Sequence, residues 1–126
     1  MKTIVLLAIP AALAGCHAAP EGPAASPTQP PQAAAGACAL EIRFGSYAMG
    51  IDSGALQRVE GLLAARRIPV QRTAWGREGE VTLCATPRTP ADAERLAREI
   101  AALLPADPRG PIAVATAAGF TFQAGR

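Results

Sequence analysis

The sequence predicts a small α+β domain in which two helices pack on one face of an antiparallel sheet. In several stretches apolar residues alternate with polar ones, which is the pattern of a strand with one buried face. Two longer stretches, about residues 52–66 and 89–104, repeat apolar residues at helical spacing. The resulting order, β-α-β-β-α-β, is that of the ferredoxin-like two-layer sandwich.

The folded domain is expected to begin with a strand near residue 40 and to continue into a helix. Leu40, Ile42 and Phe44 alternate with charged residues, and glycines then interrupt the pattern. Asp52 or Ser53 can cap the helix, which should end near residue 66. The apolar face of this helix is expected to consist of Leu56, Val59, Leu62 and Leu63.

The next segments are expected to form a hairpin. Residues 68–74 indicate a strand with Pro69 near its start, where a missing N–H is tolerated. Residues 76–79, Gly-Arg-Glu-Gly, predict a turn. Val81 and Leu83 then alternate with polar residues, which predicts the returning strand.

The second helix has the clearest start signal. Thr89 can cap it, Pro90 suits its first position, and Asp92 takes the acidic place of a capping box. Glu94 and Arg98 form an i,i+4 pair in the favourable order, and a following proline ends the helix. The predicted buried stripe consists of Ala93, Leu96, Ala97, Ile100, Leu103 and Leu104.

The last part of the domain is expected to contain a strand over residues 112–115. Phe120 and Phe122 either extend this strand or form a return strand after Gly119. The sequence leaves both possibilities open.

A disulfide between Cys38 and Cys84 is predicted from the strand order. In the ferredoxin-like arrangement the first and third strands are antiparallel neighbours, so the start of one meets the end of the other. The two cysteines occupy those places. Two free thiols are the alternative if the domain stays in a reducing compartment.

The position of Cys38 bears on the register of the first strand. A regular pairing of Cys38 with Cys84 would set Leu40 opposite Thr82, whereas the apolar pattern places Leu40 near Leu83 or Val81. Either Cys38 lies just outside the ladder or a bulge shifts the register.

The beginning of the chain has the pattern of a secretory signal peptide. A positively charged start is followed by an apolar run over residues 4–13 that is too short to span a membrane. The run ends in Leu13-Ala14-Gly15-Cys16, which closely resembles the lipobox of bacterial lipoproteins. This resemblance implies that residues 1–15 are removed and that Cys16 is the lipid-carrying N-terminus.

An ordinary signal peptide is the alternative, because Ala12-Leu13-Ala14 fits a site cut before Gly15. The chain has three cysteines, and an odd thiol is awkward in an oxidising compartment, whereas lipid on Cys16 leaves an even pair. In the lipoprotein family, Asp after the lipidated residue often causes inner-membrane retention. The chain has His17 there, so the resemblance implies the outer membrane, facing the periplasm.

Residues 16–37 are expected to form the lipid attachment point and a disordered tether. Residues 18–37 are mostly Ala, Pro, Gly, Ser, Thr and Gln, with Glu21 as their one charge. Such a segment lacks the apolar bulk that would offset its ordering entropy. The tether would hold the domain, residues 38–126, away from lipid headgroups, which favours an envelope protein or peptidoglycan as partner.

Composition and motifs predict neither an enzyme nor a nucleic-acid partner. Without Lys2, the 12 basic residues fall to eleven Arg, against 10 acidic residues, which gives no strong positive field. The single histidine lies beside Cys16, and there is no CxxC or phosphate-binding glycine motif. We therefore expect no catalytic residue, no metal and no cofactor. Glu78 and Glu80 could form a carboxylate pair of the glycosidase kind, but at a turn they are expected to be solvated.

Tyr47, Trp75 and Arg77 are the candidate binding surface. Both aromatic residues follow strands that would run parallel, so they are expected near the same end of the sheet. With nearby arginines they could hold a sugar or a protein partner. The alternative is that both rings only cover the rim of the core.

Residues 38–116 also resemble the sporulation-related repeat (SPOR) domains, a peptidoglycan-binding family with the same element order. The similar stretches are Ile42-Arg43-Phe44-Gly45-Ser46-Tyr47, Ile68-Pro69-Val70 and residues 89–100. The chain has Cys84-Ala85-Thr86-Pro87 where the family tends to show Gly-Pro-aromatic, so no binding residue is carried over. The other expectation is a non-catalytic protein-interaction or structural module.

Overall fold

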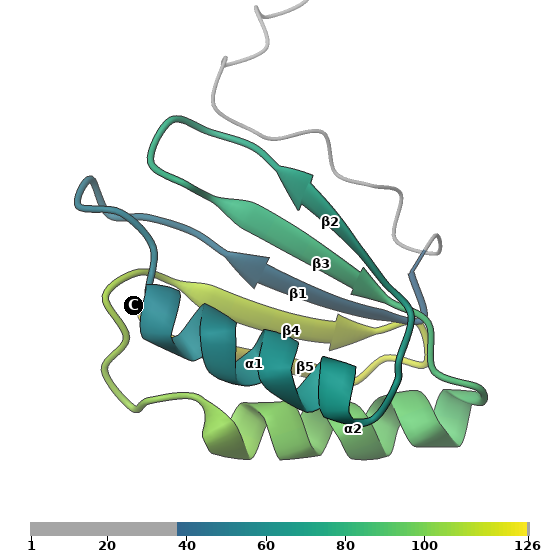
Figure 1. The fold of residues 1–126 in the computed structure, drawn as a ribbon. Helices are drawn as coiled ribbons and strands as arrows, with labels where there is room; N and C mark the ends of the chain where they lie inside the picture. Colours follow the sequence, from purple (N-terminus) through teal and green to yellow (C-terminus); the bar gives the residue numbers. More distant parts are fainter. Residues whose placement is uncertain (1–37, 126) are drawn as a thin grey trace, which may run out of the picture.

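The computed structural model describes residues 38–125. The expected leader, Cys16, His17 and the tether lie outside the described residues. A five-stranded sheet has the order β2-β3-β1-β4-β5, and two helices cover one of its faces (Figure 1). The elements are β1 (Leu40–Phe44), α1 (Ser53–Ala65), β2 (Val70–Ala74), β3 (Val81–Ala85), α2 (Pro90–Leu103), β4 (Ile112–Thr116) and β5 (Thr121–Ala124).

The predicted α+β architecture is confirmed. All neighbouring strands are antiparallel, and the first four have the order β2-β3-β1-β4 that the ferredoxin-like expectation requires. The fifth strand settles the open question at the end of the domain. Residues 117–120 form a turn, and β5 then returns along β4, with Phe122 opposite Val114.

The core lies between the sheet and the helices. Strands β1, β3 and β4 each bury every second residue, as the alternating pattern predicts, and they meet buried positions of α1 and α2. Phe44, the last residue of β1, is fully buried and lies opposite Val81 on one side and Ile112 on the other. The largest buried side chains are Phe44, Leu40, Ile42, Leu63, Leu83, Ile100, Ile112, Val59, Val81 and Val114.

Two details of the predicted core are wrong. Leu40 lies opposite Ala85 rather than beside Leu83 or Val81, because the ladder is regular and Ile42 takes the place opposite Leu83. Leu103 is 41% exposed. It is the last residue of α2, and the chain leaves the helix in an extended conformation at Leu104, so no further helical turn covers it.

Both helices begin at the expected residues. Of the two candidate caps for α1, Asp52 is the one used: its Oδ1 accepts a hydrogen bond from the N–H of Ala55 at 2.8 Å. Helix α2 is capped by Thr89, whose hydroxyl oxygen accepts from the N–H of Asp92 at 3.1 Å. The Glu94–Arg98 pair also forms, at 3.7 Å.

Replacing Asp52 by alanine should lower the free energy of unfolding by about 1 kcal/mol at neutral pH, because a helix N-terminus loses its cap. Its carboxylate also accepts from the N–H of Arg109 at 3.3 Å. The bond from Ala55, helped by that of Arg109 and by the charges of Arg58 and Arg109, lowers the pKa of Asp52 below 3.8, although partial burial opposes this shift.

A lowered pKa in the folded state means that the ionised carboxylate stabilises the fold above the unfolded pKa. This contribution is lost as the pH falls through the folded pKa. Asp52→Asn keeps the accepting oxygen without the charge, so its free energy of unfolding should fall less than that of the wild type below about pH 4. Urea unfolding at neutral and acidic pH measures this, and an equal fall in both proteins would contradict the role of the charge.

Candidate functional site

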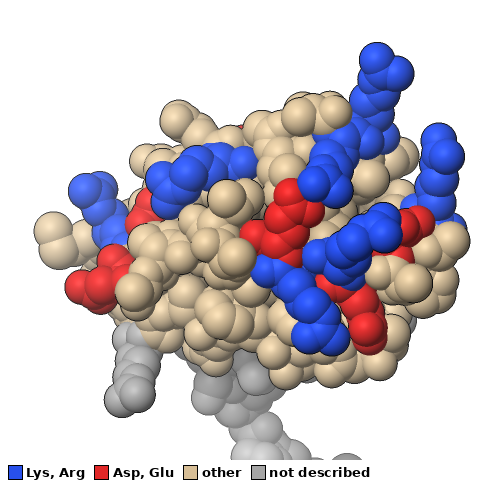
Figure 2. All heavy atoms as spheres, turned by 90° about the horizontal axis from the view of Figure 1, so that it is seen from below, with Lys and Arg blue, Asp and Glu red and all other residues tan. Residues whose placement is uncertain are grey.

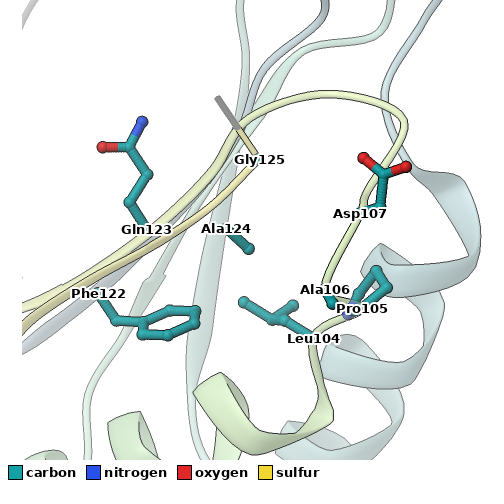
Figure 3. Close-up of a pocket in the computed structure, with 8 residues that line it drawn as sticks. All are labelled: Leu104, Pro105, Ala106, Asp107, Phe122, Gln123, Ala124 and Gly125. Atoms are coloured by element: carbon teal, nitrogen blue, oxygen red, sulfur yellow. The ribbon is translucent and has the colours of Figure 1, made fainter.

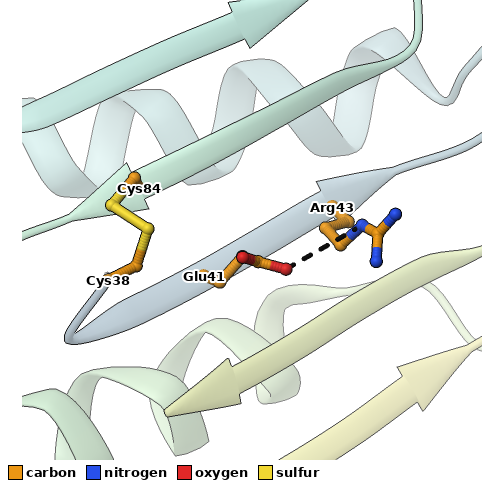
Figure 4. The surroundings of a disulfide bond; sticks show 4 residues. All are labelled: Cys38, Glu41, Arg43 and Cys84. Carbon is orange, nitrogen blue, oxygen red and sulfur yellow. Dashed lines mark ion pairs between the residues drawn. A yellow bond between two sulfur atoms is a disulfide. The ribbon is translucent and has the colours of Figure 1, made fainter. Parts of the chain in front are cut away.

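The predicted disulfide is present and lies on the sheet face opposite the helices (Figure 4). Cys38 and Cys84 have their Cα atoms 5.4 Å apart. Cys38 precedes β1 and lies outside the ladder, while Glu41 is the residue opposite Cys84. Of the two explanations offered for the register, the first is therefore confirmed, and no bulge is needed.

This face of the sheet, which we call the open face, is not covered by either helix (Figure 1). Its residues are the alternate strand positions that do not point into the core, and all are partly or fully exposed. Most of them are short or polar. They are Gln71 and Thr73 of β2, Thr82 and Cys84 of β3, Glu41 and Arg43 of β1, Ala113 and Ala115 of β4, and Thr121 and Gln123 of β5.

Trp75 is the large exception, and three contacts fix its position at one end of the open face. Its backbone N–H donates to the carbonyl of Glu80 at 2.9 Å, which continues the β2–β3 ladder by one pair. Its indole Nε1 donates to Oγ1 of Thr82 at 3.0 Å. The guanidinium carbon of Arg43 lies 5.8 Å from the ring centroid, within the range of a cation–π contact.

A shallow hollow of about 170 Å³ lies beside this pair, and its lining consists of Arg43, Gly45, Trp75, Pro111 and Ala113. The surface is depressed here because Gly45, Ala113 and Pro111 have short side chains compared with those of Arg43 and Trp75. A Cβ added at Gly45 would come within 2.9 Å of Cγ of Pro111, so the close approach requires glycine. Binding sites for whole small molecules are typically about 300–1,000 Å³, so this hollow fits one side chain or one ring.

Of the three predicted surface residues, only Trp75 lines the hollow. Tyr47 is 48% exposed, and its hydroxyl lies toward the end of β5: a Cβ added at Gly125 would be 3.2 Å from that oxygen. Arg77 is exposed in the turn between β2 and β3. The aromatic residues do follow strands that run in the same direction, but they do not form one cluster.

The turns at this end are held together by Ser46. Its hydroxyl oxygen accepts from the N–H groups of Ala48 and Gly50, both at 3.0 Å, and its O–H donates to the carboxylate of Glu78. Glu80 accepts from the N–H of Glu78 at 2.7 Å. The two carboxylates therefore bind turn groups.

Arg43 is the residue of this site that sequence reasoning missed. Its alternation with buried residues predicted only that it would face away from the core. The signal that could have found it is its cross-strand position, because Arg43 pairs with Thr82 and Ala113 and thus lies in the middle of the sheet. Recognising its contact with Trp75 also requires the ring to lean across β3, which no local pattern reveals.

Charges on the helix side are of mixed sign. Figure 2 shows basic and acidic side chains interspersed on the face seen from below. Several are paired: Arg95 with Asp92 at 2.5 Å on α2, and Arg66 with Glu99 at 2.6 Å between the two helices. Exposed pairs of this kind contribute little to stability, about 0–1 kcal/mol each.

Within residues 38–125, no group of three or more His, Cys, Asp or Glu side chains is placed to hold a metal ion. None of the helices in that range has the length and apolar character needed to cross a membrane. Comparison with protein-family models, with curated proteins and with solved structures found no match to the chain. The geometry of the open face is thus the basis for a functional proposal.

Proposed function

We propose that this chain is a membrane-anchored protein of the cell envelope whose folded domain binds a partner without catalysing a reaction. The observation that carries the proposal is the partly exposed Trp75 beside Arg43 on the open face. An antiparallel sheet often has one face in water, so openness alone has little weight. Trp and Arg, however, are the residue types that most often dominate the energy of protein interfaces.

The proposed location rests on the lipobox-like sequence at Cys16 and on the disulfide. Structural disulfides persist in oxidising compartments such as the periplasm and are rare in the cytosol. If Cys16 carries lipid, two of the three cysteines remain, and these are the two that form the Cys38–Cys84 bond. We therefore place the domain on the periplasmic side of a membrane, most simply the outer membrane.

Crosslinking in cells tests the binding surface. A photoreactive residue in place of Ala113 lies in the hollow, whereas one in place of Ala102 is exposed on α2, on the other side of the sheet. We expect a discrete adduct from position 113 that disappears in Trp75→Ala and is absent from position 102. The same adducts from both positions, or an adduct that does not depend on Trp75, would contradict the proposal.

Peptidoglycan is a second candidate partner, favoured by the shape of the hollow. Gly45 and Pro111 lie beside the partly exposed indole, and an aromatic ring offers an apolar surface on which a sugar ring can pack. The Nε of Arg43 lies 3.8 Å from Oε1 of Glu41 (Figure 4), so in this proposal its other guanidinium nitrogens pair with a carboxylate of the peptide stems. The resemblance of residues 38–116 to the SPOR domains points to the same ligand.

Sedimentation with purified cell-wall sacculi distinguishes the two partners. If the glycan candidate is right, the Cys16→Ser chain is retained, and Trp75→Ala weakens retention at least about tenfold, as expected for a central tryptophan. Tyr47→Ala and Arg77→Ala are the controls and should change retention less than about twofold, because neither side chain lines the hollow. Absence of wild-type retention contradicts the glycan candidate and leaves a protein partner.

The anchor has its own test. Cys16→Ser should remove the protein from the membrane fraction and abolish labelling with a lipid precursor, because the acyl chains supply the membrane affinity. The double variant Cys38→Ser, Cys84→Ser is the matched control, since it changes two other cysteines and should stay in the membrane. Unchanged fractionation of Cys16→Ser, or a mature chain that starts at Gly15, would contradict lipidation.

A further inference from the structure

Among the described residues, strand β5 is an edge of the sheet, and half of its backbone hydrogen-bonding groups have no neighbouring strand. In an antiparallel pair, alternate residues bond to the neighbouring strand and the residues between them point away. The N–H of Thr116 donates to the carbonyl of Phe120 at 2.9 Å, so Phe122 and Ala124 also face β4. It follows that the N–H and C=O groups of Thr121 and Gln123 point outward, where a further strand could pair with them.

A hollow of about 540 Å³ adjoins this edge on the helix side of the sheet (Figure 3). It separates β5 from the segment that follows α2. Phe122 and Leu104 point toward one another across it, and Phe122 is 37% exposed. The hollow thus lies beside unpaired backbone N–H and C=O groups of β5 and a partly exposed apolar surface. Extended peptides that add to a sheet as a strand bind to this combination.

The hollow has one charged side chain, at a defined end. Asp107 lies on the side opposite Phe122 (Figure 3), and none of the ion pairs among the described residues involves it. The charge of the nearby Arg109 interacts with Asp52 and lowers the pKa of that carboxyl group. The neighbouring Pro108 approaches Gly125, because a Cβ added there would be 3.0 Å from Cγ of Pro108. The end of the hollow that contains Asp107 is therefore the end next to the last residues of β5.

We propose that β5 and this hollow bind an extended peptide segment that adds to the sheet as an antiparallel sixth strand. In an antiparallel strand, the N-terminal residues of the peptide would lie beside Gly125 and the following residues beside Phe122. Alternate side chains of the peptide face the hollow, so one that lies opposite Ala124 is followed, two positions on, by one opposite Phe122. The preferred order is a basic residue that reaches Asp107, any residue, and then an apolar residue that packs on Phe122 and Leu104.

This surface lies at strand β5 on the helix side of the sheet, whereas the Trp75 hollow lies on the open face, so it is independent of the function proposed above. The probe is a blocked synthetic peptide, Thr-Arg-Thr-Leu-Thr-Gln, titrated into the Cys16→Ser chain. We expect binding that is detectable at about 1 mM peptide. Amide NMR shifts should be concentrated in residues 121–125 and 104–107. A shift pattern centred on the Trp75 hollow, at Arg43, Trp75 and Ala113, or no binding at that concentration, would overturn the proposal.

Variants test each part of the recognition. Gln123→Pro removes an outward N–H at an edge where proline is tolerated, so it should abolish binding and keep the fold, whereas Gln123→Ala keeps the N–H and should bind normally. Asp107→Asn should weaken the arginine peptide about two- to fivefold and leave a peptide with neutral citrulline unchanged. Glu60→Gln, on α1, is the charge control.

Two outcomes would overturn the proposal even if the peptide binds. One is affinity that does not change in Gln123→Pro, because the edge would then play no part. The other is concentration-dependent dimerisation through β5 without peptide, seen by sedimentation, because the occupant would then be a second copy of this chain. A loss of binding in Asp107→Asn that is equal for both peptides would contradict the assigned charge pair.

Discussion

A double variant with serine at positions 38 and 84 should have a free energy of unfolding about 4 kcal/mol below that of the oxidised protein. The bond joins residues separated by 46 positions, and closing a loop of that length in the unfolded chain removes much of its entropy. A domain of this size has a total stability of roughly 4–13 kcal/mol. The disulfide thus supplies a large part of it.

Urea unfolding of the double variant, and of the wild type with and without reductant, measures this effect. Reduced wild type and double variant should agree closely, because both cysteines are only partly buried and exchanging sulfur for oxygen there costs little. A difference below about 1 kcal/mol between oxidised and reduced wild type would show that the bond is not an important source of stability.

The second large effect is expected at Phe44. Phe44→Ala should lower the free energy of unfolding by about 3–5 kcal/mol, the usual cost of removing a buried aromatic ring from a core. Phe44 is 0% exposed and lies on the central strand β1, with the helices above it and neighbours on both sides. The surrounding backbone is hydrogen-bonded on both edges, so it can collapse only slightly into the cavity.

Phe122→Ala is the matched control, since it removes the same atoms from an edge strand. Phe122 is partly exposed already, and its loss leaves an open hollow rather than a closed cavity, so the expected cost is about 1 kcal/mol or less. Equal costs at the two positions would contradict the placement of the core. Together, the disulfide and Phe44 variants compare how much a covalent bond and core packing contribute to the free energy of unfolding of one small domain.

The elements that could be predicted from the sequence are those with local signals. Helix α2 begins where Thr89 and Pro90 indicate, and the strands that bury one face have the expected alternation. The Cys38–Cys84 bond could be predicted because strand order and cysteine positions agree. Agreement between independent signals is what makes such an inference strong.

The parts that could not be predicted depend on tertiary geometry. The exposure of Leu103 follows from how the chain leaves α2. For β5, Gly119 marked a turn, with φ +108°, but Phe120 and Phe122 fitted a continued strand equally well until the pairing with β4 was known. The contact of Arg43 with Trp75 depends on a side chain that crosses a strand. The hollow beside β5 arises only when the segment after α2 is placed against an edge strand.

The position of the disulfide also matters for mechanical load. Cys38 is the point at which the described domain begins, and its bond to Cys84 ties that point to the end of β3. Tension that arrives from the N-terminal side would otherwise peel β1 from its neighbours one ladder bond at a time. With the bond, two adjacent strands share the pull and must be extracted together, so we expect slower forced unfolding of the oxidised domain. With the lipid anchor and the partner proposed above, the domain would keep its shape under tension between its two points of attachment.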